Sequence, residues 1–195
     1  MWNERYGKTE YAFGTKPNDF LVSAVSRIPR GKILCLGEGE GRNAVYLASL
    51  GYEVVAVDQS EVGLAKAEKL AAQRQVQIKT IVADLAEFVI EPKAWQGVVS
   101  IFCHLPSVLW QRVHTDAIAG LASGGVLVLE AYTPRQLEFK TGGPNNLDML
   151  VSLESVKSKL PKLDLEIGEE IDREVIEGIY HNGMAAVVQI LGRIH

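Results

Sequence analysis

Cysteine is scarce in this sequence. The 195 residues include two cysteines, Cys35 and Cys103, and both lie in apolar runs typical of strands. Two thiols cannot build a disulfide framework, and no Cys or His spacing matches that of a metal site. We therefore expect two buried, reduced thiols and no bound metal.

Concentrated positive charge and long apolar runs are also missing. The chain has 20 Lys and Arg against 24 Asp and Glu, which gives a net charge of −4 with no basic block. A nucleic-acid partner needs a basic face, and a membrane span needs about 20 apolar residues. The polar start, MWNERYG, is not typical of a signal peptide. These absences argue against nucleic-acid and membrane partners and favour a cytoplasmic location.

The composition itself is that of a globular domain. Hydrophobic residues make up 47% and charged residues 23%, and 195 residues suit one domain with a sizeable core. We find no internal repeat and no linker. The sequence therefore predicts a single domain over 1–195.

The most informative segment runs from Ile33 to Asp58. An apolar run leads into three alternating glycines, a helix-forming stretch follows, and a second apolar run ends at Asp58. Strand, glycine loop, helix, strand and acid form a nucleotide-binding βαβ unit. The glycines let the backbone approach a ligand that a Cβ would push away, and the acid can accept both hydroxyls of a ribose.

Strand and helix patterns alternate up to residue 132 and then change. Alternation predicts a parallel sheet with helices on both faces. Only seven residues, 177–183, separate the last two strand-like runs, so those strands must be antiparallel. A long polar loop is expected over 133–146. Strands are expected near 33–37, 53–57, 77–82, 98–103, 126–131, 163–176 and 184–193, and helices near 20–25, 60–73, 107–121 and 152–158.

Six segments in this order resemble the class I S-adenosylmethionine-dependent methyltransferases, and within them the tellurite-resistance or thiol-methyltransferase branch. They are YAFGTKPNDFL (11–21), GEGEGRN (37–43), IFCHLP (101–106), EAYTPRQ (130–136), TGGP (141–144) and EGIYHNG (177–183). The resemblance implies a Rossmann-like three-layer α/β sandwich, whose seven-stranded, mainly parallel sheet has an antiparallel last strand. It also implies S-adenosyl-L-methionine as cofactor, S-adenosyl-L-homocysteine as product, and a small-molecule acceptor such as a thiol or a selenium or tellurium compound.

The resemblance also assigns cofactor contacts. Asp58 would hold the ribose, Asp84 the adenine amino group, and Leu85 would pack on the adenine. Arg42 and Asn43 would hold the cofactor carboxylate or brace the loop. The full set of expected cofactor residues is Gly37, Glu38, Gly39, Gly41, Arg42, Asn43, Asp58, Gln59, Ser60, Asp84, Leu85, Cys103, Tyr11 and Phe13.

One position departs from the family pattern. Many class I methyltransferases have an acid two residues before the first glycine, where it helps hold the methionine amino group. This chain has Cys35 there, which cannot serve as a carboxylate. Glu38 and nearby backbone carbonyls are the candidates to replace it.

The glycine loop alone does not decide between two ligands. Gly39-x-Gly41-x-x-Ala44 also fits the NAD fingerprint, with Asp58 19 residues beyond Gly39. Glu38 and Glu40 would repel a pyrophosphate but would tolerate a sulfonium cation. An NAD(P)-dependent oxidoreductase and a non-catalytic S-adenosylmethionine-binding module remain the alternatives.

Three residues are candidates for catalysis. His104 and Tyr132 follow the fourth and fifth strands, where the active-site rim of an open α/β sheet lies, and His181 lies between the last two strands. A histidine could take the proton of a thiol near neutral pH, whereas a softer nucleophile would need no base. A structural, hydrogen-bonded histidine is the alternative.

Other segments are assigned to the acceptor side and to a lid. Arg173, Gly143 and Tyr132 are candidates for substrate binding, since Arg173 could hold an anion in a bidentate contact or simply face solvent. Residues 133–150 would form a substrate-side loop. Residues 1–30 are expected to form a lid, with Tyr11 and Phe13 over the sulfonium, or else to pad the sheet edge. The protein is expected to be a monomer or a homodimer.

Overall fold

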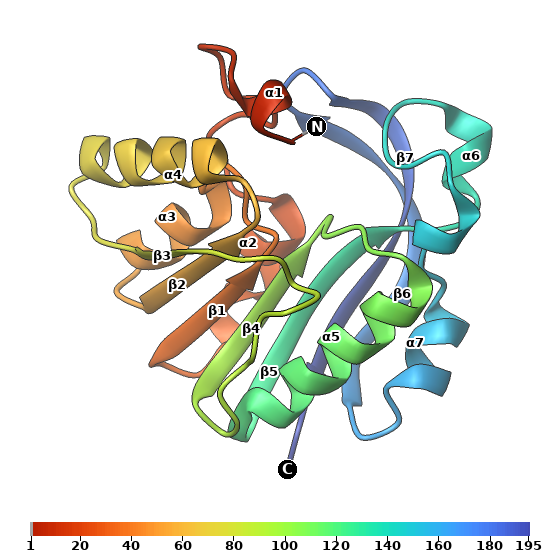
Figure 1. Cartoon of the computed structure of the whole chain (residues 1–195). Helices are drawn as coiled ribbons and strands as arrows, with labels where there is room; N and C mark the ends of the chain where they lie inside the picture. Colours follow the sequence, from red (N-terminus) through yellow and green to blue (C-terminus); the bar gives the residue numbers. More distant parts are fainter. Residues whose placement is uncertain (1) are drawn as a thin grey trace.

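Seven strands form one mixed sheet at the centre of the protein (Figure 1). The computed structural model describes residues 2–195, and the strand order within them is β3-β2-β1-β4-β5-β7-β6. The strands are β1 (Lys32–Leu36), β2 (Glu53–Asp58), β3 (Lys79–Val82), β4 (Trp95–Ile101), β5 (Leu121–Tyr132), β6 (Asp164–Glu177) and β7 (His181–Arg193). The order reverses at β1, where the chain crosses from one half of the sheet to the other, and ligands bind at such a switch point.

The last strand runs against its neighbours, as predicted. β1, β2, β3, β4 and β5 pair in parallel, whereas β7 is antiparallel to both β5 and β6. The expected connection at 177–183 is wrong in length, because the β6–β7 ladder continues up to the pair Glu177 and His181. His181 therefore belongs to a strand, and its side chain is buried rather than in an open loop.

Alternate strand residues face two separate cores. Leu34, Leu36, Val55 and Val57 pack with side chains of α5 and α7 on one face. Ile33, Cys35, Val54 and Ala56 pack with α2, α3 and α4 on the other. Figure 1 shows these helix groups on opposite sides of the sheet. The α-helices are α1 (Trp2–Tyr6), α2 (Asp19–Ala24), α3 (Arg42–Ser49), α4 (Glu61–Gln73), α5 (Ser107–Gly120), α6 (Gln136–Phe139) and α7 (Leu153–Lys159).

Helix starts follow the local sequence. Asn18 caps α2 by accepting from the Leu21 N–H, and Ser60 caps α4 by accepting from the Gly63 N–H. The expected loop at 133–146 is wrong in part, since it contains the short helix α6, which begins two residues after Pro134. None of the helices in residues 2–195 is long and apolar enough to cross a membrane.

The fourth strand ends earlier than expected. β4 stops at Ile101, because Phe102 takes a left-handed conformation with φ of 51°. A non-glycine residue seldom adopts this conformation, and such strain concentrates at functional sites. Cys103 and His104 follow it, so the turn directs them away from the strand. Figure 1 shows α1 above this same edge of the sheet, next to α4.

Candidate active site

The glycine loop lies where β1 ends, and two of its glycines leave no room for a Cβ. Gly37 and Gly39 have φ of +60° and +61°. A Cβ on Gly37 would lie 2.7 Å from the Cys103 Sγ, and one on Gly39 would lie 2.6 Å from the Tyr6 hydroxyl. The loop therefore needs glycine for both conformation and space.

Asp58 braces this loop from the end of β2. Its carboxylate accepts hydrogen bonds from the Gly39 N–H and the Ser60 N–H, both at 2.8 Å. The side chain is buried, and burial raises its pKa. Asp58, Ser60 and Gly39, all predicted as cofactor residues, thus form one hydrogen-bonded unit.

Glu38 occupies the N-terminus of α3. Its Oε1 accepts hydrogen bonds from the Asn43 N–H at 3.0 Å and from the Ala44 N–H at 2.8 Å. Burial raises the pKa of Glu38 to about 7, and the neighbouring Glu38 adds to burial in raising the pKa of Cys35. In a dinucleotide-binding fold these amides receive the pyrophosphate, so Glu38 stands where that anion would bind.

Glu40, the other glutamate of the loop, points elsewhere. One carboxylate oxygen pairs with Lys66 Nζ at 2.5 Å, and the other accepts from the Ala12 N–H at 2.7 Å. The expectation that both glutamates face the ligand therefore fails for Glu40, whose charge is neutralised by Lys66. Its contacts attach the N-terminal segment to the glycine loop and to α4.

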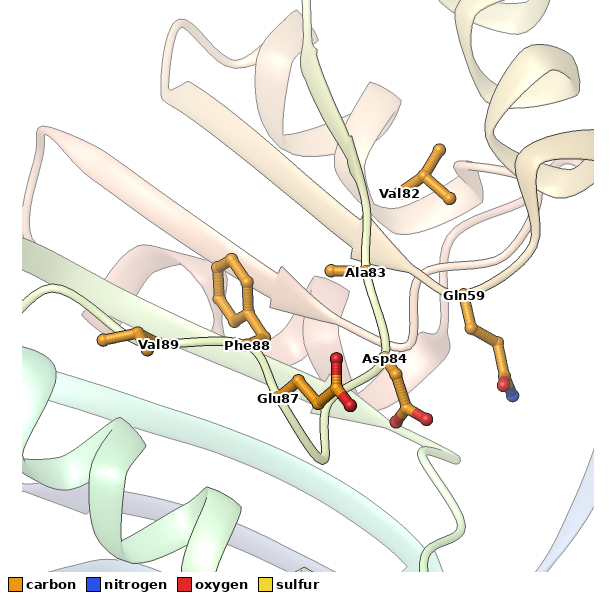
Figure 2. Close-up of a pocket in the computed structure, with 7 residues that line it drawn as sticks. All are labelled: Gln59, Val82, Ala83, Asp84, Glu87, Phe88 and Val89. Carbon is orange, nitrogen blue, oxygen red and sulfur yellow. The ribbon is translucent and has the colours of Figure 1, made fainter.

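A surface pocket of about 700 Å³ opens beside the ends of β2 and β3 (Figure 2). Asp84 is exposed at this pocket, and its Oδ1 accepts from the Ala86 N–H at 2.8 Å, so it also holds its own turn. Leu85 is buried. The pocket is lined by Gln59, Val82, Ala83, Asp84, Glu87, Phe88 and Val89. Its place next to Asp58 suits the predicted adenine contacts, which stay a prediction.

Beyond the glycine loop, the three candidate catalytic residues meet in one group of rings. We call Phe13, Phe102, His104, Tyr132 and His181 the aromatic cluster. The His104 and Tyr132 rings stack with centroids 5.4 Å apart, and Tyr132 meets His181 edge-on at 5.4 Å. The ring centroids of Phe13 and Phe102 lie 4.5 Å and 4.9 Å from that of His181. Gly143 lies against Tyr132, where an added Cβ would be 2.6 Å from the ring.

Both histidines of the cluster are uncharged at neutral pH. Burial lowers the pKa of His104 to about 3, helped by the nearby His181, and burial also lowers the pKa of His181. Within residues 2–195, both ring nitrogens of His104 are buried without a hydrogen-bond partner. The His181 Nδ1 is buried too, and it faces the Glu177 Oε2 at 3.7 Å, beyond hydrogen-bond distance. Buried polar atoms usually have partners, so the cluster offers free hydrogen-bonding positions for a ligand.

A buried network of charges lies behind this cluster. Arg173 donates two hydrogen bonds to Glu130, at 2.8 and 2.7 Å, and Arg42 donates to Glu177 at 2.6 Å. Asn18 Nδ2 lies 2.5 Å from Glu130 and 2.9 Å from Glu177, and so joins the two pairs. Arg173 is thus bound to Glu130 and lies outside the aromatic cluster, and its substrate role stays a prediction.

Arg42 and Asn43 bind distant parts of the chain, and their expected roles toward the cofactor carboxylate or the glycine loop stay predictions. Arg42 pairs with Glu177, and the Asn43 side chain accepts from the Asn18 N–H at 2.9 Å. Tyr11 and Phe13, the two aromatic residues of the predicted lid, lie in different places. Phe13 joins the aromatic cluster, whereas Tyr11 packs on α4 under Lys66, whose Nζ lies 4.8 Å from the ring centroid.

Sequence reasoning missed Tyr6, Glu130 and Glu177. Tyr6 is 5% exposed and lies against Gly39 and Gly63, where it covers the glycine loop. Glu130 gave one usable signal, because a lone charge inside the apolar run VLVLEA indicates a buried partner. Glu177 stands beside a turn glycine, and its neighbours give no sign of its burial.

Comparison with known proteins gives both domain and fold matches. Residues 33–125 match the family model described as a methyltransferase domain. A segment of 85 residues is 34% identical to a probable S-adenosyl-L-methionine-dependent methyltransferase TehB of Haemophilus influenzae, and it covers 41% of this chain. That match spans 30% of the relative's length. A segment of 71 residues is 34% identical to Hemagglutinin 1 of Eikenella corrodens, covering 36% of this chain and 24% of that one.

Two solved structures illustrate the fold. TehB from Haemophilus influenzae superposes with a TM-score of 0.74 at 20% identity, covering 100% of this chain and 66% of that one. Magnesium protoporphyrin IX methyltransferase from Synechocystis PCC 6803, solved with bound SAH, superposes with a TM-score of 0.66 at 16% identity. The superposition covers 89% of this chain and 78% of that one. At these identities the likeness establishes the Rossmann-like fold, in agreement with the predicted sandwich.

Proposed function

We propose that this chain is a class I S-adenosylmethionine-dependent methyltransferase of the TehB-like branch and that it transfers a methyl group to a small-molecule acceptor. The matched methyltransferase domain, the TehB relative and the shared fold support this. One observation carries the proposal. The braced glycine loop and the aromatic cluster lie next to each other at the carboxyl edge of the sheet, with Tyr6 between them. Tyr6 contacts Gly39, and its ring centroid lies 6.3 Å from that of Phe13, a member of the cluster. A cofactor site and an acceptor site are thereby adjacent.

The residues of the loop fit this cofactor. Gly37 and Gly39 let the loop adopt its left-handed turns. Asp58 offers a carboxylate for ribose hydroxyls, and Glu38, when ionised, offers negative charge toward a sulfonium and an amino group. The pocket beside Asp84 and Gln59 would receive the adenine. When bound, S-adenosylmethionine supplies a methyl group on a positively charged sulfur and leaves as S-adenosylhomocysteine.

The aromatic cluster suits a thiol or a selenium or tellurium compound. Ring faces favour soft, polarisable groups, and the cluster excludes water from much of its interior. An uncharged histidine can accept the proton of a neutral thiol, whereas an acceptor that is already anionic needs only orientation. The N-terminal segment, through Tyr6 and Phe13, would serve as the lid over both sites.

The oxidoreductase alternative is disfavoured by Glu38. Its carboxylate already accepts the N–H groups of Asn43 and Ala44, which a dinucleotide pyrophosphate would need. A second anion at that position would be repelled while Glu38 is ionised. The non-catalytic alternative predicts cofactor binding without turnover.

We also propose that residues 1–195 act as a single methyltransferase domain, as a monomer or a homodimer, in the cytoplasm and without a nucleic-acid partner. The net charge of −4 and the two buried free thiols support this.

Calorimetric titration with S-adenosylhomocysteine and NAD⁺ side by side tests the cofactor. We expect binding of the first and none of the second, and the reverse result would overturn the proposal. Transfer of labelled methyl groups to small thiols, selenite and tellurite then tests the activity. Labelling of none of them, with cofactor binding intact, would favour the non-catalytic module.

A further inference from the structure

Glu177 and His181 face each other across the turn that joins β6 to β7. They form the last pair of the β6–β7 ladder, and both are buried. The Glu177 Oε2 lies 3.7 Å from the His181 Nδ1. We infer that Glu177 is a positioning residue that holds a proton on His181 Nδ1, so that Nε2 can accept the proton of the methyl acceptor. This rests on the proposed function.

Contacts with neighbouring side chains keep the Glu177 carboxylate ionised. Burial by itself would raise its pKa, but contacts with His181, Arg42 and Asn18 outweigh burial and hold the pKa at about 2. The carboxylate is therefore ionised at neutral pH and can only accept hydrogen bonds. At 3.7 Å the attraction between this negative charge and an Nδ1–H, rather than a formed hydrogen bond, favours the Nδ1–H tautomer of His181.

The surrounding rings hold the orientation of His181. Phe13, Phe102 and Tyr132 surround the imidazole with centroids between 4.5 and 5.4 Å away. The Nδ1 edge faces Glu177, so Nε2, at the other side of the ring, points away from that carboxylate. Packing on several sides restricts rotation of the ring, and this is what a positioned base requires.

The contrast with His104 decides which histidine acts as the base. No carboxylate contacts His104 among the described residues, and its pKa of about 3 makes it a weak base. His181 faces Glu177 from β6, Arg42 from α3, Arg5 from α1 and His104 after β4. Glu177 raises its pKa, whereas burial and the two arginines lower it. Glu177 offsets these effects in part, and the pKa of His181 stays below its ordinary value. His104 has no such carboxylate, so His181 is the better acceptor of a thiol proton.

The proton balance is simple. The proton leaves the acceptor S–H for His181 Nε2, which becomes an imidazolium with both nitrogens protonated. The ionised Glu177 stabilises that positive charge. After the methylated product leaves, Nε2 releases the proton to water, and no oxidant or reductant is needed.

Nitrogen-15 NMR of the histidine rings tests the tautomer in the full chain with S-adenosylhomocysteine present. The His181 signals are assigned by their loss in His181→Gln. We expect Nδ1 protonated and Nε2 unprotonated in the native chain near neutral pH. An Nε2–H tautomer would overturn the inference, and this measurement needs no variant of Glu177 to fold.

Glu177→Gln tests the positioning role. We expect a mixture of tautomers and a lower pKa of His181. The matched control is Glu130→Gln, which removes a buried carboxylate of the same network that does not contact His181. An equal change of the His181 signals in both variants would mean that the network merely supports the fold.

Kinetics separate this role from a structural one. With 2-mercaptoethanol as acceptor, we expect Glu177→Gln to lower kcat about a hundredfold and leave KM for S-adenosylmethionine unchanged. With selenide, which is anionic at neutral pH, we expect little change in kcat. Equal losses with both acceptors would contradict the inference, whereas failure to bind S-adenosylhomocysteine would instead contradict the proposed function.

Discussion

Glu38 and Ala44 are joined by a hydrogen bond of 2.8 Å from the Ala44 N–H to the Glu38 carboxylate. This bond places a negative charge from the glycine loop at the positive end of α3. When Glu38 is ionised, α3 has an anion from its own chain at its N-terminus, which distinguishes this loop from a pyrophosphate-binding one. The same carboxyl is partly shielded from water, and its pKa is about 7.

Glu38 makes the stability of the protein depend on pH. Its pKa rises from 4.5 to about 7 on folding, so between these values the folded chain binds more protons than the unfolded chain. Its contribution to the free energy of unfolding therefore falls as pH rises through this interval, by on the order of 2 kcal/mol. Glu38→Gln keeps an acceptor for α3 but does not titrate. Urea denaturation of both proteins across this interval should show the native chain losing stability relative to the variant, and parallel curves would contradict the prediction.

Gly39 is predicted to be irreplaceable for ligand binding. Alanine there must adopt φ of +61° and place a methyl group against the Tyr6 hydroxyl. Gly124→Ala is the matched control, because Gly124 has φ of +75° with nothing within 4 Å of an added Cβ. We expect each substitution to lower the free energy of unfolding by about 1 kcal/mol, with a larger loss at Gly39. Calorimetry should show weaker S-adenosylhomocysteine binding for Gly39→Ala alone, and equal affinities would exclude this role of the loop.

Asp58 is predicted to contribute directly to cofactor affinity. Asp58→Asn keeps the size of the side chain but removes the charge that accepts from Gly39 and Ser60. Charge-assisted hydrogen bonds are worth about 1.5–3 kcal/mol, so we expect affinity for S-adenosylhomocysteine to fall about tenfold to a hundredfold. The control is Asp116→Asn, which removes a half-exposed carboxylate of α5 that pairs with Arg112. Retained affinity in Asp58→Asn would argue that Asp58 only braces the loop.

Lys66 is predicted to hold the N-terminal segment closed. Its Nζ lies 2.9 Å from the Lys8 carbonyl oxygen, 2.7 Å from that of Glu10 and 2.5 Å from the Glu40 carboxylate. Lys66→Met leaves Glu40 buried without its cation, which should cost about 3 kcal/mol of stability.

Hydrogen exchange measures the consequence. Amides of residues 2–14 should exchange faster in Lys66→Met, because the segment opens locally. Lys69→Met, an exposed lysine on the same helix, should leave exchange unchanged. Unchanged exchange in Lys66→Met would mean that packing of Tyr6 and Phe13 alone holds the segment.

Much of the site could be located from the sequence, because its parts follow strand ends. Asp58, His104 and Tyr132 each come directly after an apolar run, and parallel strands bring their carboxyl ends to one edge. Their partners could not be located in this way. Arg173 reaches Glu130 across 43 positions, and Arg42 reaches Glu177 across 135. Such pairs form only when strands and helices that are distant in the sequence have packed together.

The sequence by itself determined the βαβ unit, the parallel strands and the reversed last strand. These features depend on neighbouring residues, through hydrophobic periodicity, turn chemistry and the length of a connection. Only the tertiary structure decided that Glu40 turns to Lys66, that His181 lies in a strand beside Glu177, and that Tyr6 covers Gly39. The reason is physical: a side chain's partner is set by which distant elements pack against it, and local patterns carry no information about that packing.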